Sequence, residues 1–152
     1  MHRLYVKDDI TVFWDSEVCR HAKQCVGGAP QVFDITRRPW IDLSRGDSAQ
    51  IWQAISKCPT GALGVTYNHG ITVEFDEKEQ RSIATINGEV IGECDSSADE
   101  KGWVIYHTHV LPEYEGKSVA KRLVYCMIEA AERRKVNITA TCSYAARILN
   151  RS

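Results

Sequence analysis

Strong net charge, long apolar runs and internal repeats are all missing from this sequence of 152 residues. The 19 Lys and Arg residues nearly balance the 20 Asp and Glu residues, and the formal net charge is -1. Such a chain has no strong field with which to attract nucleic acid or anionic lipid. It also has no apolar run of the roughly 20 residues that a membrane span needs. The sequence therefore predicts no nucleic-acid partner and no membrane partner.

A secretory signal is also missing. The segment 1–9 turns acidic where a signal peptide would have its apolar core. The sequence therefore predicts a cytoplasmic protein in a reducing compartment. In such a compartment, six cysteines are better explained as metal ligands, reactive thiols or core residues than as three disulfides. The length suits one ordinary domain or two very small ones.

Three of the cysteines have a spacing that suits one metal centre. Cys19 and Cys25 lie in one short segment, and Cys58 follows an amphipathic helical pattern and directly precedes Pro59. A Cys-Pro pair closes the cluster-binding loops of bacterial ferredoxins. The pattern therefore predicts that the three thiolates gather around one metal centre. Three unrelated buried thiols are the alternative.

Residues 10–63 resemble the divergent single-cluster ferredoxin family of bacterial proteins. The resemblance is carried by Cys19, His21, Cys25, Pro30, Val32-Phe33-Asp34, Arg38-Pro39-Trp40-Ile41 and Cys58-Pro59-Thr60-Gly61-Ala62-Leu63. It implies an iron–sulfur cluster bound by the three cysteines. Ala22 stands where ordinary ferredoxin loops carry a middle ligand, so a 3Fe-4S cluster is expected, or a 4Fe-4S cluster whose last iron has another ligand such as His21. A Cys3His zinc site is the rival.

Basic side chains surround this expected site: Arg20, Lys23, Arg37 and Arg38. They are able to guide an acidic redox partner protein, and a solvated basic surface is the alternative interpretation.

The second half of the sequence has the pattern of a small α/β domain. Strands are expected at 71–75, 81–86, 90–94, 103–110 and 137–142, and helices at 116–134 and 143–149. Asn87-Gly88 predicts a tight hairpin, 64–70 the boundary between the halves, and 96–102 a polar turn. Alternation along a strand places Trp103, Ile105, His107 and His109 on one face.

Residues 71–149 resemble the minimal GNAT acetyltransferases. The resemblance is carried by Asn87-Gly88, Ile105, His107-Thr108, Val110, Pro112, Glu115-Gly116-Lys117, Ala120, Leu123 and Cys142-Ser143-Tyr144. It implies that acetyl-CoA binds, with its pyrophosphate on the main-chain N–H groups of Gly116, Lys117, Ser118, Val119, Ala120 and Lys121. The pantetheine arm is then expected between the strands that end at Val110 and Cys142. Ser118 replaces a glycine that the family commonly has.

The same resemblance supplies three catalytic candidates. Cys142 is expected beside the acetyl group, where it either carries the acetyl transiently or only contacts it, and a buried small side chain is the alternative. His109 stands where an acidic residue is common and offers an imidazole base. Tyr144 is a candidate acid, with packing as the alternative.

These patterns together predict an α+β protein: a ferredoxin-like iron–sulfur domain (1–66) followed by a GNAT-like domain of reduced size (67–152). The first functional hypothesis is an enzyme that transfers acetyl from acetyl-CoA to an amine whose identity the sequence does not reveal. The second is a non-catalytic redox or metal-binding protein whose GNAT-like half only binds CoA or a protein partner.

Overall fold

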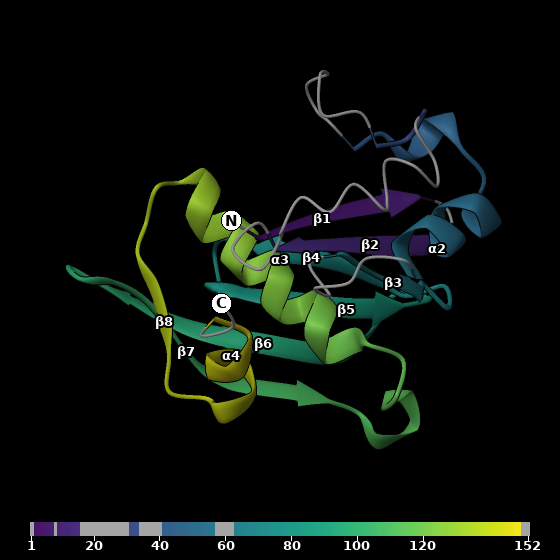
Figure 1. The fold of residues 1–152 in the computed structure, drawn as a ribbon. Coiled ribbons are helices and arrows are strands. Elements are labelled where there is room, and N and C mark those ends of the chain that lie inside the picture. Colours follow the sequence, from purple (N-terminus) through teal and green to yellow (C-terminus); the bar gives the residue numbers. More distant parts are fainter. Residues whose placement is uncertain (1, 8, 16–30, 34–40, 57–62, 150–152) are drawn as a thin grey trace.

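The computed structural model describes residues 2–7, 9–15, 31–33, 41–56 and 63–149, and these residues form two sheets. The first sheet has three strands in the order β1-β2-β3, and the second has five in the order β4-β5-β6-β7-β8. Figure 1 shows the two sheets beside one another, with helix α3 running across both. The architecture is the mixed α+β fold that the sequence predicts.

The small sheet is antiparallel and comes from the N-terminal part of the chain. Its strands are β1 (His2–Lys7), β2 (Ile10–Asp15) and β3 (Leu63–Tyr67), and the short 3-10 helix η1 (Leu43–Arg45) and α2 (Ser48–Ser56) lie between β2 and β3 in the sequence. Ile51 and Ile55 of α2 are buried against β-strand residues such as Val12. This apolar cluster is the core that the first half of the chain builds for itself.

The large sheet comes from the C-terminal part of the chain. Its strands are β4 (Thr72–Asp76), β5 (Arg81–Ile86), β6 (Glu89–Asp99), β7 (Gly102–Val110) and β8 (Ile138–Ala140). All neighbouring pairs are antiparallel except β7 and β8, which are parallel. Asn87 and Gly88 join β5 to β6 with φ values of 51° and 82°. Two successive positive φ angles are what a type I′ hairpin needs, so this predicted turn is confirmed.

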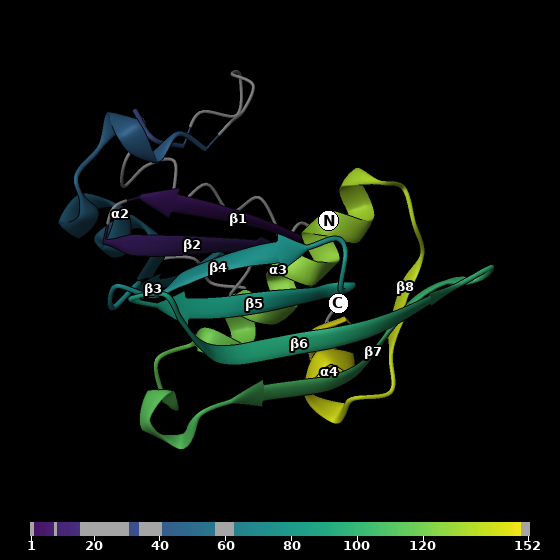
Figure 2. The same ribbon diagram turned by 180° about the vertical axis from the view of Figure 1, so that it is seen from behind.

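Two helices cover one face of the large sheet, and the other face is bare of described helices. The short 3-10 helix η2 (Pro112–Tyr114) leads to α3 (Val119–Arg133), and α4 (Ser143–Leu149) follows β8. Figure 2 shows the uncovered face. Leu123, Met127 and Ile128 of α3 are fully buried on the sheet, as their three- and four-residue spacing predicts. No helix in the described part of the chain is long and apolar enough to cross a membrane.

A β-bulge in β7 overturns one prediction. Ser96 pairs with Ile105, but Asp95 pairs with His107, so Tyr106 is the extra residue. An extra residue turns every later side chain to the opposite face. Trp103 and Ile105 are buried, whereas His107 and His109 lie on the exposed face. The prediction that all four share one face is therefore wrong.

One expected turn proves to be mostly strand. The predicted polar turn 96–102 is mostly paired backbone, because β6 continues to Asp99 and only Glu100 and Lys101 form the turn. The segment 95–99 has few of the apolar side chains that mark a strand in sequence, yet pairing with β7 holds it extended. Strand β3 overlaps the predicted boundary 64–70 and pairs with β2 of the first half.

Helix α3 joins the two halves of the chain. The Glu129 carboxylate accepts a hydrogen bond from the Leu4 N–H at 2.8 Å, and Glu132 accepts from the His2 N–H at 3.0 Å. The Lys121 ammonium lies 4.4 Å from the ring centre of Phe13 in β2. One helix thus contributes to the core of the second half and binds the edge strand of the first.

Candidate functional site

The large sheet opens between β7 and the chain that follows β8. Pairing between these parallel strands stops at Ile105 and Ala140. The N–H groups of Thr141 and Cys142 then both point to the Ile105 carbonyl, at 2.9 and 3.2 Å. Beyond that point β7 continues to Val110, and no described strand pairs with it on the β8 side. An unpaired stretch of strand edge thus faces the start of α4.

Cys142 lies at this opening. The Thr108 hydroxyl lies between two sulfurs, 3.6 Å from Cys142 Sγ and 3.7 Å from Cys94 Sγ. Burial raises the pKa of the Cys142 thiol, but the N–H groups of Ala145 and Tyr144 and the Thr108 hydroxyl favour the thiolate by more. The net effect is a pKa below the ordinary value. A lowered pKa is what a reactive thiol needs, so Cys142 stays a candidate for the chemical role that the sequence predicts.

The other two described cysteines are different. Cys94 is fully buried in the core, and Cys126 is partly buried on α3. Burial raises the pKa of each thiol to about 12. Cys94 is thus a core residue, and neither thiol shares the lowered pKa of Cys142.

The loop from Gly116 to the start of α3 is the segment that the sequence predicts to bind the pyrophosphate. Gly116 has φ +80°, and a Cβ built on it would meet nothing within 4 Å. Ser118 is the N-cap residue in the left-handed region, at φ 60° and ψ 22°, and its side chain makes no capping hydrogen bond. The first helical bond runs from the Arg122 N–H to the Ser118 carbonyl at 3.0 Å. The amides of Val119 and Ala120 therefore lack helical partners, as at any helix start.

Lys121 differs from its neighbours because its side chain turns toward the first half of the chain. Besides Phe13, its ammonium lies 5.7 Å from the Tyr125 ring centre. Only its main chain belongs to the expected phosphate-binding loop.

The histidine candidates lie on the uncovered face of the sheet. His107 and His109 are exposed, and their rings stack with centres 6.1 Å apart and planes 9° apart. Because Thr108 between them points to Cys142, His109 lies on the opposite side of the sheet from the thiol. Tyr144, in the first turn of α4, is 37% exposed, and burial raises the pKa of its phenol.

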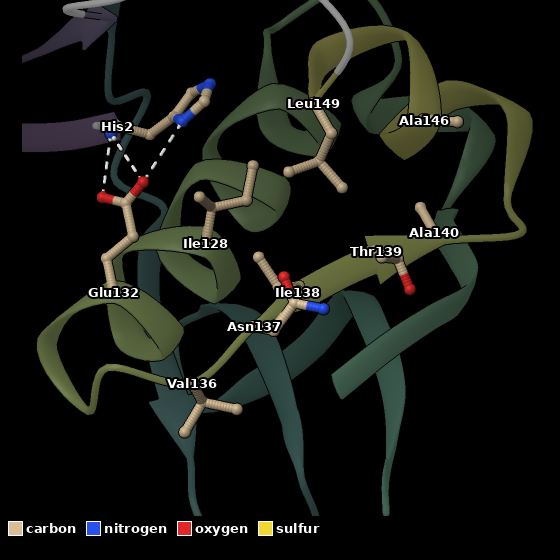
Figure 3. A pocket seen from close by; sticks show the side chains of 10 residues that line it. All are labelled: His2, Ile128, Glu132, Val136, Asn137, Ile138, Thr139, Ala140, Ala146 and Leu149. Carbon is tan, nitrogen blue, oxygen red and sulfur yellow. Dashed lines mark hydrogen bonds and ion pairs between the residues drawn. The ribbon is translucent and has the colours of Figure 1, made fainter. Parts of the chain in front are cut away.

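A cavity of about 410 Å³ lies at the other end of α3. Its lining comes from β1, α3, β8, α4 and the connection before β8: His2, Ile128, Glu132, Val136, Asn137, Ile138, Thr139, Ala140, Ala146 and Leu149. Figure 3 shows mostly apolar side chains around it, with Glu132 and His2 joined at one end. None of the residues expected to bind acetyl-CoA lines this cavity.

The four predicted metal ligands lie outside the described residues. These are Cys19, His21, Cys25 and Cys58. The flanking elements that are described, β2 and α2, end at Asp15 and Ser56. The ligand set and its geometry therefore stay predictions.

Family comparisons match the two halves separately. Residues 5–68 match the family described as a divergent 4Fe-4S mono-cluster, and residues 81–152 match the family described as a GCN5-related N-acetyl-transferase. The chain therefore belongs to the divergent 4Fe-4S mono-cluster family through its N-terminal half, which is fused to a GCN5-related N-acetyltransferase domain. The two resemblances read from the sequence are both confirmed.

Curated relatives match the first half alone. The chain is 35% identical over 68 residues to the uncharacterized protein YjdI of Escherichia coli, in each of two strains. The match covers 45% of this chain and 87% of that protein. The iron–sulfur half thus has a relative of nearly its own length.

Solved acetyltransferase structures show a more distant likeness. A GCN5-related N-acetyltransferase from Sphaerobacter thermophilus aligns with a TM-score of 0.41 and 17% identity, covering 89% of this chain and 36% of that one. A ribosomal-protein-alanine N-acetyltransferase from Brucella melitensis aligns with a TM-score of 0.36 and 14% identity, covering 93% and 86%. Naa50 from Arabidopsis thaliana, in complex with a bisubstrate analogue, aligns with a TM-score of 0.36 and 15% identity, covering 53% and 79%.

Proposed function

We propose that the second half of this chain transfers the acetyl group of acetyl-CoA to an amine, beside an iron–sulfur cluster held by the first half. The observation that carries this proposal is the open edge of β7 with Cys142 beside it. An extended pantetheine arm needs unpaired main-chain groups along its length. The edge of β7 from Tyr106 to Val110 offers them.

The loop before α3 is proposed to hold the pyrophosphate. Its amides from Gly116 to Lys121 lead into and begin α3. The N-terminal dipole of this 15-residue helix favours an anion. The open space around Gly116 is consistent with a phosphate approaching the backbone there. Ser118 is the one residue that departs from the pattern of the family, because it carries a side chain at a left-handed backbone position where glycine is common.

Three side chains are proposed to act on the reacting groups. The amine approaches from the uncovered face, where His109 accepts its proton. Main-chain N–H groups near Val110 stabilise the oxyanion. Cys142 and Tyr144 lie on the side from which the CoA thiolate departs. The Tyr144 phenol donates a proton that neutralises this thiolate.

The role of Cys142 divides into two cases that one experiment separates. If the Cys142 thiolate attacks the thioester, CoA leaves as its thiolate and an acetyl-cysteine remains until the amine takes the acetyl group. If Cys142 only contacts the donor, the amine attacks the thioester directly. Incubation with acetyl-CoA and no amine, followed by peptide mass spectrometry, shows an acetylated Cys142 in the first case and an unmodified one in the second.

For the first half we propose a cluster bound by Cys19, Cys25 and Cys58, of the 3Fe-4S type or of the 4Fe-4S type with His21 as further ligand. The family match at residues 5–68 supports an iron–sulfur cluster in general. Purification without air followed by iron and sulfide analysis tests it. Iron and sulfide in near-equal amounts are expected, whereas stoichiometric zinc without sulfide would contradict the cluster. An Ala22→Cys variant, which restores the middle ligand, is expected to raise the iron content if the native cluster has three irons.

The second candidate is a non-catalytic protein in which the GNAT-like half only binds CoA or a protein partner. Ser118 favours this candidate, because it places a side chain in the proposed phosphate loop where the family commonly has glycine. Calorimetry with acetyl-CoA and an assay for CoA release with polyamines, lysine peptides and free amines separate the two. Tight binding without turnover of any amine, unchanged in Cys142→Ala, would favour the second candidate.

Three further expectations remain proposals. A division into 1–66 and 67–152 is consistent with β3 ending at Tyr67. A cytoplasmic location is consistent with the free thiols of the three described cysteines. An acidic redox partner protein for the first half is proposed from the basic residues near the expected cluster alone.

A further inference from the structure

The uncovered face of the large sheet carries two rows of polar side chains in register. Strand pairing aligns Glu74, Ile83, Glu93 and His109 in one row, and Asp76, Arg81, Asp95 and His107 in the next. The row between them points the other way. It contains Ser82, whose hydroxyl donates to the Leu123 carbonyl of α3. The two rows therefore share the face opposite the helices, which Figure 2 shows uncovered.

Three of these side chains converge on one point. A carboxylate oxygen of Glu93, one of Asp95 and a ring nitrogen of His107 all lie within 4.8 Å of one another. They come from two adjacent strands, with Glu93 and Asp95 two residues apart and His107 directly opposite Asp95. Such spacing on one sheet face brings side chains to within contact distance without any loop having to fold around them.

Charge at this point is unbalanced. Glu93 and Asp95 place two carboxylates side by side, and together with Glu74 and Asp76 the two rows contain four. Arg81 is the sole guanidinium or ammonium in the rows, and its guanidinium pairs with Glu93 at 3.0 Å. A second cation at this point would remove the repulsion that remains.

We propose that Glu93, Asp95 and His107 bind a divalent transition-metal ion such as Zn²⁺ on the uncovered face of the sheet. Imidazole nitrogen together with carboxylate oxygen suits zinc and its first-row neighbours better than magnesium or calcium, which prefer oxygen alone. Three protein ligands leave a position open for water or for a ligand from solution. The ring of His109, stacked against His107, borders the site.

This site is separate from the predicted cluster. It contains no thiolate, and its ligands come from β6 and β7 rather than from the first half of the chain. The sequence signal for it is a pair of i, i+2 motifs, Glu93-Cys94-Asp95 and His107-Thr108-His109, each of which presents both polar side chains on one strand face. The bulge at Tyr106 turns the second motif to the same face as the first.

The test is a calorimetric titration of the cluster-loaded full chain with Zn²⁺, with the iron content measured before and after to show that the cluster is retained. One Zn²⁺ per chain is expected at the new site. His107→Gln and Asp95→Asn are each expected to weaken it at least about tenfold, as loss of a metal ligand does. His69→Gln removes an exposed histidine from the turn before β4 and is the matched control, with unchanged affinity expected.

The Arg81→Gln variant is expected to change the Zn²⁺ affinity in the opposite direction, which a misfolded protein would not do. It removes the cation that competes for Glu93, so tighter Zn²⁺ binding is expected. Zinc binding that persists in His107→Gln and Asp95→Asn would place the ion elsewhere and overturn the proposal. An absence of any zinc binding while the iron is retained would overturn it as well.

Discussion

The chemistry expected of Cys142 depends on its immediate neighbours. Main-chain N–H groups at the start of α4 and the Thr108 hydroxyl lower the pKa of its thiol, whereas burial is the largest of the causes that raise the pKa of Cys94 and of Cys126. Three thiols in one small domain thus differ in reactivity for reasons visible around each sulfur.

We expect iodoacetamide to alkylate Cys142 well before Cys94 and Cys126. Because the pKa of the Cys142 thiol lies below that of an ordinary cysteine, its thiolate forms at a pH where an ordinary thiol is still protonated. As the pH is raised, the alkylation rate of Cys142 should therefore begin to increase before that of the other two. Thr108→Val removes one donor and should shift that rise to higher pH. Peptide mass spectrometry over a pH series measures each cysteine separately. Equal rates for the three thiols would contradict the assignment.

Ser118 is a second residue whose local geometry makes a prediction. A non-glycine residue in the left-handed region costs about 1 kcal/mol, so Ser118→Gly is expected to raise the free energy of unfolding by about that amount or somewhat less. Lys135→Gly is the matched control. Lys135 also has a positive φ, of 56°, and it ends α3 in a Schellman turn. Both variants should gain stability in chemical denaturation. Only Ser118→Gly should also change acetyl-CoA affinity.

At the scale of elements, α3 has two tasks. Its first turn forms the loop proposed for the pyrophosphate, and its sides bind the first half of the chain. Arg122 of the same helix binds the connection that follows the first half. Its guanidinium is 3% exposed and donates to the Ile71 carbonyl at 2.8 Å and to the Asn68 carbonyl at 3.5 Å. These carbonyls belong to the connection between β3 and β4.

Replacing Arg122 with Met should therefore destabilise the protein by about 2–3 kcal/mol, because buried carbonyls lose a charged donor. The control is Arg133→Met, which removes an exposed i, i+4 pair with Glu129 and should cost no more than about 0.5 kcal/mol. Urea denaturation of both variants measures the difference. Equal losses would show that Arg122 does not hold the connection.

Some elements of the fold could be predicted from sequence patterns, and others could not. β5 was predictable to the residue because its alternation and the Asn87-Gly88 turn agree with the packed structure. β1 was not predicted, since its polar residues are extended mainly by pairing with β2 and by carboxylates of α3. The bulge at Tyr106 was not predictable either, because nothing local distinguishes one residue of an alternating strand as the extra one. Without knowledge of that bulge, the polar motifs 93–95 and 107–109 cannot be placed on one face of the sheet from the sequence.

At the scale of the whole molecule, the two halves are in direct contact through α3, β1 and β2. A change in the first half therefore has a physical route to the proposed phosphate loop. We predict that acetyl-CoA affinity differs between the oxidised and the reduced protein, as calorimetry on both forms measures. Glu129→Gln, which weakens the contact with Leu4, should reduce that difference. Equal affinities in the two redox states would show that the halves act independently.

Acetyl-CoA binding at the loop before α3 is the step on which the proposed acetyl transfer depends. Gly116 and Gly70 form a matched pair, because both have positive φ, +80° and +73°, and both have nothing within 4 Å of an added Cβ. Alanine introduces the same backbone strain at each, but only Gly116 lies in the proposed site. Calorimetric titration with acetyl-CoA should give one molecule bound per chain, with affinity unchanged in Gly70→Ala and weakened in Gly116→Ala. No binding to the wild-type chain, or equal binding to both variants, would contradict the account.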